Sequence, residues 1–483
     1  MAKMLVAGEW VDGASREHVP VLNPATGEVV DTVPQATPED VDRAVAAAKA
    51  SFPEWSRTDP EHRAEALRRG LERVRACQDE IADLLVREQG KPTHEALAEL
   101  NHLLHGLAYY ADLASKLRGS YVPLPSHLGT SFGLVVRRPL GVVAAIVPWN
   151  YPLTLMGTKV GPALIAGNTV VVKPASTTPL AATRVVGLLQ EAGLPPGVLN
   201  VVTGPGRVVG EHLVAHPDVV RVAFTGETAT GRRVMEVAGP AFKRVTLELG
   251  GSDPVIVCSD ADLDQAVRGV LVGRYWNCGQ SCLAAKRVYV FEDVYEPFLE
   301  KLLAGVSRYE PGEGWVRPER PKIRIGPLHT AQQRAEVLAQ MQDALQRGAR
   351  VAYGGRVPEG REQGHFLEPT VLVDVPHDSR VVQEEVFGPV LPVFRVRDMD
   401  EAIRLANDSP YGLGSSIWTS NVRWIHKAVQ ELEAGMTWVN QVHYGYDELP
   451  FGGTKQSGFG KEHGVEALDY YVELKSVVVG GLG

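Results

Sequence analysis

Short apolar runs alternate with amphipathic helical segments between residues 140 and 251, and this rhythm constrains the fold more than any other feature. The runs expected to form buried strands are 141–147, 169–172, 198–202, 220–224 and 245–249. Helical crossovers between such strands give a parallel sheet with helices on both faces. The expected fold class is therefore α/β, with a doubly wound parallel sheet of the kind that binds dinucleotides.

The glycine pattern typical of dinucleotide binding, Gly-X-Gly-X-X-Gly after the first strand, is absent. Gly204, Gly206 and Gly210 only approximate it. These residues by themselves therefore leave the cofactor open.

Length, charge and apolar content limit the classes of protein to which the chain can belong. The chain has 483 residues, too many for one compact core, so two or three domains are expected. A net charge of −9 and a pI of about 5.9 argue against binding to nucleic acid or to an anionic membrane. The N-terminal apolar run is too short for a signal peptide, and the longest later one, 140–149, is about half of a membrane span. Four scattered cysteines form no disulfide framework, so a reducing cytoplasm is expected.

A second alternating α/β region follows from 252 to 440, and two segments stand outside both regions. Segment 119–137 interrupts the helical pattern with prolines and a glycine, and the tail 465–483 contains a long apolar strand-like run. A long exposed edge strand needs a partner. The tail therefore indicates a homodimer or homotetramer, in which it pairs with 119–137 of another subunit; a tail folded back on its own subunit is the alternative.

The turn 276–287 places a cysteine where a small reactant can reach it. Cys282 follows a Gly-Gln pair and precedes a strand-like run, whereas a structural cysteine more often lies within an apolar run. A thiolate is a strong nucleophile when a base or a lowered pKa supplies it. Glu248 ends the strand 245–249, where a carboxylate can act as general base on a thiol or a water. Taken singly, the two residues also fit a packed turn cysteine and a solvated glutamate.

The two stretches together resemble a known family. Leu-Glu-Leu-Gly-Gly at 247–251 is followed by Gly-Gln-Ser-Cys at 279–282, so Cys282 lies 34 positions after Glu248. This order and interval resemble the aldehyde dehydrogenase superfamily, over nearly the whole chain. The resemblance implies oxidation of an aldehyde to the carboxylic acid with hydride transfer to NAD(P), through a cysteine thiohemiacetal and a thioester that water hydrolyses.

The resemblance also implies a division of the chain. Residues 1–118 and 138–248 would form the dinucleotide-binding domain, 249–446 the second α/β, catalytic domain, and 119–137 with 465–483 a small β oligomerisation element.

Four residues take catalytic roles by resemblance. Cys282 is the expected nucleophile and Glu248 the base that activates water. Asn150 follows the first strand of the sheet and, with the Cys282 N–H, would form the oxyanion hole; a simple turn is the alternative for this motif. Glu462 falls where many relatives keep a second acid on the proton exit path, and it could equally be structural.

The cofactor is expected to be NADP or NAD, with NADP favoured. Relatives selective for NAD usually carry Glu at the position of Ser176, and its loss leaves room for a 2′-phosphate beside Lys173. Glu227 replaces the usual Ser of a Phe-Thr-Gly-Ser turn, so it should point away from phosphate, capping the helix or meeting Arg232, or phosphate is held elsewhere. The expected cofactor contacts are Val147, Trp149, Lys173, Ser176, Gly206, Gly210, Gly226, Glu227, Leu249, Glu385 and Phe387.

The aldehyde is expected to be aromatic or medium aliphatic, because the residues aligned with the family's pocket are largely aromatic and uncharged. If Arg274 faces inward, a semialdehyde that bears a carboxylate becomes the better expectation. The expected substrate contacts are Tyr151, Thr154, Leu155, Trp276, Ser281, Leu283, Tyr444, Tyr446 and Phe451.

Other activities remain as alternatives. A catalytically silent structural homologue, an esterase and a CoA-acylating dehydrogenase would share the fold, but the catalytic set and Glu248 favour hydrolysis by water. Cys278 and Cys282 lack further ligands nearby, so no metal is expected. Glu473 is expected to pair with Arg244 or Lys461, supporting the catalytic strand.

Overall fold

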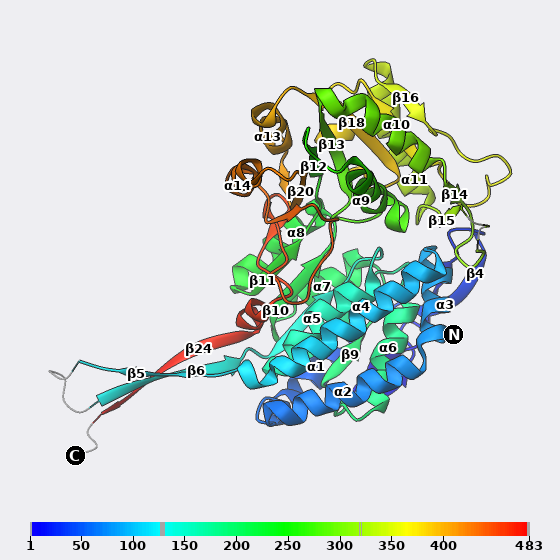
Figure 1. The fold of residues 1–483 in the computed structure, drawn as a ribbon. Coiled ribbons are helices and arrows are strands. Elements are labelled where there is room, and N and C mark those ends of the chain that lie inside the picture. Colours follow the sequence, from blue (N-terminus) through cyan, green and yellow to red (C-terminus); the bar gives the residue numbers. More distant parts are fainter. Residues whose placement is uncertain (1, 126–130, 318, 320, 481–483) are drawn as a thin grey trace.

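The computed structural model describes residues 2–125, 131–317, 319 and 321–480, which form two α/β bodies and a projecting arm (Figure 1). The larger sheet has the strand order β2-β1-β9-β8-β7-β10-β11-β23. Its five central strands, β9, β8, β7, β10 and β11, run parallel to one another. These are the five strands expected from the rhythm of 140–251. Their bounds are β7 (Val142–Ile146), β8 (Thr169–Lys173), β9 (Leu199–Val201), β10 (Val219–Thr225) and β11 (Arg244–Glu248). The edges are β1 (Met4–Val6), β2 (Glu9–Val11) and β23 (Gly458–Phe459).

Helices cover both faces of this sheet because its strands are apolar on both sides. Along β7, Val143 and Ala145 pack into one hydrophobic cluster while Val142 and Ala144 pack into the other, as the two-residue period of a strand requires. The first cluster holds α2 (Pro60–Ala76), α3 (Gln78–Gln89), α4 (Thr93–Asp112), α5 (Pro152–Ala166) and α6 (Leu180–Glu191). The second holds α1 (Pro38–Trp55), α7 (Glu211–Ala215) and α8 (Thr228–Ala238).

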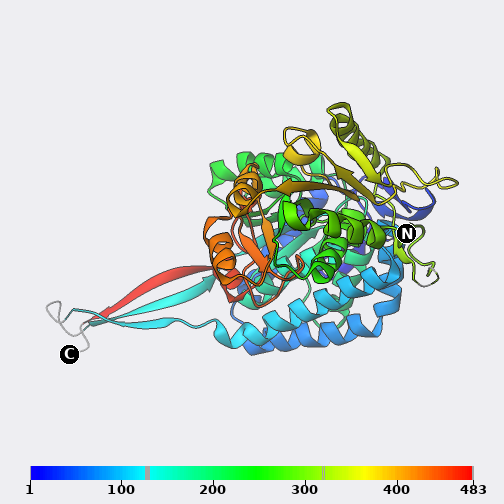
Figure 2. The same ribbon diagram turned by 45° about the horizontal axis from the view of Figure 1, so that its top comes forward.

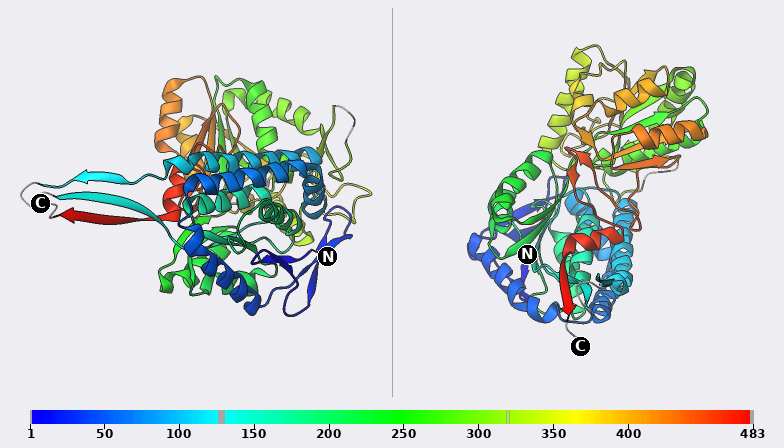
Figure 3. Two further views of the ribbon diagram at one scale, coloured as in Figure 1. Left: turned by 90° about the horizontal axis from the view of Figure 1, so that it is seen from below. Right: turned by 90° about the vertical axis from the view of Figure 1, so that its left-hand side faces the viewer.

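The second body contains a seven-stranded sheet of order β16-β17-β18-β13-β12-β20-β21, parallel except for the β16 edge. The α/β class is thus confirmed for both bodies, which Figure 3 separates in its right-hand view. The strands are β12 (Asp253–Val257), β13 (Ala285–Phe291), β16 (Arg350–Tyr353), β17 (Thr370–Val373), β18 (Val390–Val396), β20 (Gly414–Trp418) and β21 (Met436–Val439). The helices are α9 (Leu263–Tyr275), α10 (Tyr295–Val306), α11 (Ala331–Gln346), α12 (Arg380–Gln383), α13 (Met399–Asn407) and α14 (Val422–Glu431). The exact domain boundaries stay a prediction.

The arm is built from β5 (Ser120–Pro123), β6 (Ser131–Pro139) and β24 (Val472–Gly480), and it extends away from both bodies (Figure 2). Strand β24 pairs antiparallel with β6 of the same chain, from Val472 opposite Pro139 to Gly480 opposite Ser131. The expectation that the tail pairs with this segment of another subunit is therefore wrong, because the tail folds back. Residues 126–130 and 481–483 of the expected oligomerisation element lie outside the described residues.

The tail also differs locally from the expected strand. Residues 465–471 form a 3-10 helix, η7 (Val465–Tyr471), and the strand begins only at Val472. Arg244 lies 3.7 Å from Glu473 and donates a hydrogen bond to the Val472 carbonyl, so the expected ionic support of β11 is present. Among the helices of the described residues, none is long and apolar enough to cross a membrane.

The remaining short elements are β3 (His18–Leu22) paired with β4 (Val29–Pro34), β14 (Tyr309–Pro311) paired with β15 (Ile323–Ile325), and β19 (Tyr411–Gly412) paired with β22 (Thr454–Lys455).

Candidate active site

The cysteine turn is held in a strained backbone conformation. In the 3-10 turn η5 (Trp276–Gly279), Asn277 and Cys278 have φ values of 52° and 57°, which cost energy for residues with a Cβ. Buried hydrogen bonds offset this cost: the Asn277 N–H donates to Glu95 of α4 at 2.8 Å, and its side-chain amide donates to the Asn150 carbonyl at 3.0 Å. The turn that presents Cys282 is thereby fastened to the other body.

Cys282 lies at the wall of a cavity and is half-buried. Burial raises the pKa of its thiol to about 12, and the nearby Lys286 ammonium opposes that rise. The thiol form therefore dominates, and a base must remove its proton before it can attack a carbonyl.

Glu248 can be that base. It ends β11, is 2% exposed, and neither carboxylate oxygen has a hydrogen-bond partner within the described part of the chain. Burial, followed by the charge of Glu462, raises its pKa well above the ordinary range. Burying a carboxyl group without a hydrogen-bond partner costs free energy, so its presence here points to a functional role.

Glu462, in contrast, is fully engaged. It accepts hydrogen bonds from the Thr158 hydroxyl at 2.6 Å and from the Lys159 ammonium at 2.7 Å, both on α5. Lys159 also donates to Thr225 at the end of β10. This buried network lies close enough to Glu248 for the charge of Glu462 to act on it.

Asn150 lies at the carboxyl end of the sheet and is 5% exposed. Its side-chain amide donates to the Gln280 carbonyl at 3.1 Å, while its own backbone carbonyl accepts from Lys91 at 2.9 Å. Lys91 is itself buried against Glu99, whose carboxylate accepts the Leu153 N–H at the start of α5. The structure thus brings Asn150 to the cysteine turn and fixes its backbone with two donors.

Lys286 joins the parts of the site, although sequence reasoning passed over it. Its ammonium donates to the carbonyls of Gly251 and Cys282, at 2.7 and 3.2 Å, and pairs with Glu385 at 2.5 Å. Its position four residues after Cys282 was the only signal in the sequence.

A cavity of ≈ 290 Å³ opens at Cys282. Eight of the nine expected substrate contacts line it: Tyr151, Thr154, Leu155, Trp276, Ser281, Leu283, Tyr444 and Phe451. The ninth, Tyr446, does not; its ring packs against Tyr444 and its hydroxyl accepts from Gln441 at 3.1 Å. The described lining of the cavity therefore includes Tyr444 but not Tyr446.

Arg274 also faces away from the cavity. It is buried on α9 and donates to the backbone carbonyls of Val386 and Gly388. The possibility that it meets a substrate carboxylate is therefore removed.

Half of the cavity wall consists of residues that no sequence motif points to. Residues 98, 99 and 102 lie on one face of α4, a helical spacing that is visible in the sequence but carries no motif. The additional lining residues are Ala98, Glu99, His102, Val272, Gly273, Val442, His443, Gly445 and His463.

A second cavity, of ≈ 840 Å³, lies between α7, α8 and the sheet. Gly206 and Gly210 line it, as do two cationic residues that the sequence analysis did not single out, Arg207 and Arg233. A Cβ on Gly206 would meet only open space. Glu211 also lines the cavity and pairs with Arg233 at 2.5 Å. A large cavity at a glycine-rich turn, with the Arg207 guanidinium on its wall, fits a dinucleotide phosphate.

Lys173 and Ser176, the two polar residues expected beside the 2′-phosphate of NADP, lie near this second cavity. Lys173 is buried, and burial lowers its pKa to about 8; its ammonium donates to the Pro174 carbonyl at 3.0 Å. The Ser176 hydroxyl donates to the Gly204 carbonyl at 3.0 Å. A Cβ on Gly210 would touch the Lys173 stem at 3.5 Å, so these residues border one region.

Five further expected contacts are apolar or close-packed. Val147 and Leu249 are buried in the hydrophobic clusters. The Trp149 ring stacks on His329 at 4.5 Å and meets the edge of Phe387 at 5.5 Å. A Cβ on Gly226 would lie 2.7 Å from the Phe224 ring.

The two acidic residues among the expected cofactor contacts, Glu385 and Glu227, differ in their surroundings. Glu385 is tied to Lys286 and to the Gly251 N–H at 3.0 Å. Glu227 is exposed at the N-terminus of α8 without a side-chain capping bond, and Arg232 donates to Gln456 instead. In the described part of the chain, neither side-chain capping by Glu227 nor a hydrogen bond between Glu227 and Arg232 is seen, which leaves the alternative that phosphate is held elsewhere.

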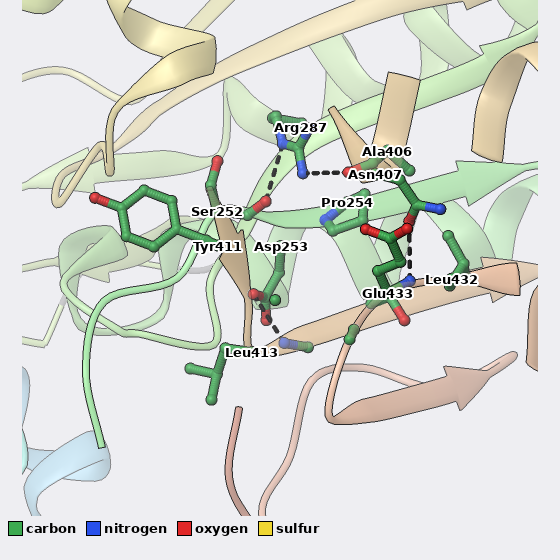
Figure 4. Close-up of a pocket in the computed structure, with 14 residues that line it drawn as sticks. Ser252, Asp253, Pro254, Arg287, Ala406, Asn407, Tyr411, Leu413, Leu432 and Glu433 are labelled. Atoms are coloured by element: carbon green, nitrogen blue, oxygen red, sulfur yellow. Dashed lines mark hydrogen bonds between the residues drawn. The ribbon is translucent and has the colours of Figure 1, made fainter. Parts of the chain in front are cut away.

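A small polar cavity of ≈ 10 Å³ lies near the start of β12 (Figure 4). Asp253 accepts the Gly414 N–H, and Arg287 donates to the carbonyls of Ser252 and Ala406. The space holds about one water, so this cavity supports the strand and is not a substrate site. Among the residues that the structure describes, no group of three or more His, Cys, Asp or Glu side chains could hold a metal.

Comparison with known proteins agrees with this geometry. The Aldehyde dehydrogenase family model matches residues 10–477. A glutarate-semialdehyde dehydrogenase of Pseudomonas putida is 40% identical over 474 residues, 98% of this chain and 97% of that protein. The Escherichia coli succinate-semialdehyde dehydrogenase (NADP+) is 39% identical, over 99% of this chain and 97% of that protein. A crystal structure of Staphylococcus aureus betaine aldehyde dehydrogenase in complex with NAD+ superposes with a TM-score of 0.95 at 34% identity, covering 100% of this chain and 95% of that chain. The chain therefore belongs to the aldehyde dehydrogenase family and is an NAD(P)-dependent enzyme of that family.

Proposed function

We propose that Cys282, Glu248 and Asn150 carry out the oxidation. The observation that carries this proposal is that the Cys282 thiol on the cavity wall lies near enough to the unpartnered, buried Glu248 carboxyl group to feel its charge, while the Asn150 amide is hydrogen-bonded to the same cysteine turn. Glu248 removes the thiol proton, and the sulfur bonds to the aldehyde carbon while the carbonyl electrons move to oxygen. The Asn150 amide and the Cys282 N–H hold that oxyanion, which contributes roughly 3–4 kcal/mol per donor in comparable sites.

Bound NAD(P) supplies the hydride acceptor, and the adduct becomes a thioester on Cys282. Glu248 then takes a proton from water as the water oxygen attacks the thioester carbon. The thiolate leaves and the acid departs. We assign Glu462, with Lys159, to the proton route away from Glu248, because the charge of Glu462 acts on Glu248.

We propose NADP as the preferred cofactor. Ser176 leaves no carboxylate beside Lys173, and Arg207 adds a positive charge to the neighbouring cavity. The relatives include both an NADP enzyme and an NAD complex. Comparing kcat/KM for the two cofactors tests this, and a tenfold preference for NAD would contradict it.

The relatives favour a semialdehyde with a carboxylate at its far end, because two of them oxidise glutarate or succinate semialdehyde according to their names. We therefore propose this substrate class in place of the aromatic or medium aliphatic aldehyde expected from the sequence. One observation favours the neutral aldehyde as a second candidate: no Lys or Arg is among the described residues that line the cavity.

A panel of semialdehydes and neutral aldehydes, assayed with both cofactors by the absorbance of the reduced cofactor, tests the function. Acid and reduced cofactor should form in equal amounts. Absence of cofactor reduction with every aldehyde, from a folded protein, would reject the enzyme in favour of a silent homologue.

We also propose that the arm mediates a homodimer or homotetramer. Leu474 and Val478 of β24 are 66% and 69% exposed, and Tyr121 of β5 is 65% exposed, so both outer strands present apolar side chains. Light scattering should give two or four chain masses; a monomer at micromolar concentration would exclude this role. Cytoplasmic location stays a prediction.

A further inference from the structure

An aspartate with two histidines lies behind the cavity wall, outside the catalytic set. Asp447 is 2% exposed and accepts from the Nδ1 atoms of His463, at 2.8 Å, and His105, at 2.5 Å. Burial acts to raise the pKa of Asp447, but the hydrogen bonds from His463 and His105 outweigh it and hold the pKa below its usual value. The carboxylate is therefore ionised, and both Nδ1 atoms carry protons.

This arrangement fixes which atom of His463 meets the cavity. With Nδ1 committed to Asp447, the remaining Nε2 lies on the side of Gly445, where an added Cβ would be 3.9 Å from it. Both His463 and Gly445 line the cavity, and no hydrogen bond to this Nε2 exists within the described residues. The ring is held by Phe451 at 5.5 Å and by His102 at 6.1 Å.

The charges around the pair favour an anionic ligand. Two imidazoles direct their Nδ1 atoms to one carboxylate, so a proton on Nε2 of His463 would place a positive charge at the cavity wall. Glu448 also acts on His105, but it is exposed and screened by water. The carboxylate of Glu99, also on the wall, is already engaged by Lys91 and the Leu153 N–H.

We propose that His463, positioned by Asp447 and protonated on both ring nitrogens when the substrate is bound, donates through Nε2 to the carboxylate at the far end of a semialdehyde substrate, with His102 as its neighbour on the cavity wall. The site thus uses imidazole where the described lining offers no guanidinium or ammonium group. This inference rests on the proposed semialdehyde function and names the residue that selects the substrate.

The test compares succinic semialdehyde with butanal, which has the same carbon chain without the carboxylate. In His463→Gln, the ratio of kcat/KM for the two aldehydes should fall by about tenfold or more, mainly through KM for the semialdehyde, because a charged hydrogen bond is lost. Asp447→Asn should lower the same ratio, as a positioning change. The matched control is His62→Gln, an exposed histidine of α2, which should leave both rates as in wild type.

A ratio in His463→Gln within about twofold of the wild-type ratio would overturn the proposal, as would a wild-type enzyme that prefers butanal. Should the variants fail to fold, the wild-type enzyme still decides the matter: glutarate should inhibit butanal oxidation competitively and glutaramide should not, and equal inhibition by both would overturn the inference. If no aldehyde is oxidised, the proposed function fails. Calorimetry would then still test the anion site: binding of glutarate but not of glutaramide would support it. Equal binding of the two compounds would reject it.

Discussion

The two cavities of this enzyme differ in how their walls are charged. The ≈ 840 Å³ cavity has two arginines on its wall, one of them paired with Glu211, whereas the ≈ 290 Å³ cavity at Cys282 is lined mainly by aromatic rings, imidazoles and apolar groups, with Glu99 and no Lys or Arg among its described lining residues. A dinucleotide carries several phosphates, so its site needs fixed positive charge and close backbone approach. A drier wall limits the access of water to the thioester that we propose forms on Cys282. The same burial raises the pKa of the thiol, which is why the proposed mechanism needs Glu248 as a base.

Substitution of the proposed nucleophile should produce the largest difference between its effect on catalysis at the smaller cavity and its effect on NADP binding at the larger one. Cys282→Ala should lower kcat by about 10⁴-fold or more, as loss of a covalent nucleophile does. NADP binding, measured by fluorescence or calorimetry, should stay within about threefold of wild type, since Cys282 belongs to the smaller cavity alone. Loss of NADP binding would show that the two regions are coupled.

Removal of the base should have the next largest effect. Glu248→Gln keeps the shape of the side chain but cannot accept a proton, so kcat should fall by about 10²- to 10⁴-fold. A thioester that accumulates on Cys282, detected by mass spectrometry of the quenched protein, would show that hydrolysis is the step affected. An unchanged kcat would remove Glu248 from the mechanism.

The pH profile should follow the same two groups. Burial raises the pKa of both Glu248 and Cys282, the latter to about 12, so the reactive, deprotonated forms gain population as pH rises. We expect kcat/KM of wild type for butanal, which does not depend on the proposed anion contact of His463, to increase from neutral to alkaline pH, and the part of this rise due to Glu248 to vanish in Glu248→Gln. A profile that falls with rising pH in this range would contradict the assignment.

On the cofactor side, Ser176→Glu should move the preference from NADP towards NAD. The new carboxylate would repel a 2′-phosphate beside Lys173, which should lower kcat/KM for NADP by about tenfold or more. Ser115→Glu, at an exposed position of η1 (Leu113–Lys116), is the matched control and should leave the cofactor ratio unchanged. Equal losses with NADP and NAD would mean that Ser176 supports the fold rather than the choice of cofactor.

The smallest effect concerns Tyr446. Because it lies outside the substrate cavity, Tyr446→Phe should change kcat/KM by less than about twofold for every aldehyde. Tyr444→Ala, which removes a ring that lines the cavity and stacks on His102 at 5.1 Å, should change substrate selectivity more. A reversal of this order would return Tyr446 to the pocket.

The sequence by itself determined the α/β class and the five strands of the first sheet, and it singled out the proposed catalytic set Cys282, Glu248 and Asn150. Each of these depends on local pattern: buried parallel strands are continuous apolar runs, and strand ends and tight turns are where short polar motifs stand. The same locality explains why the preferred cofactor could be argued from Ser176 alone.

The tertiary structure decided the features that depend on the orientation of side chains and on contacts between residues far apart in the sequence. Tyr444 and Tyr446 are two residues apart in one loop, yet only one faces the cavity. Arg274 turns towards backbone carbonyls, and the tail strand finds its partner within its own chain. His102 and His463 come together from α4 and a loop more than 350 positions later, because packing of helices and loops, rather than sequence spacing, brings their rings to one wall.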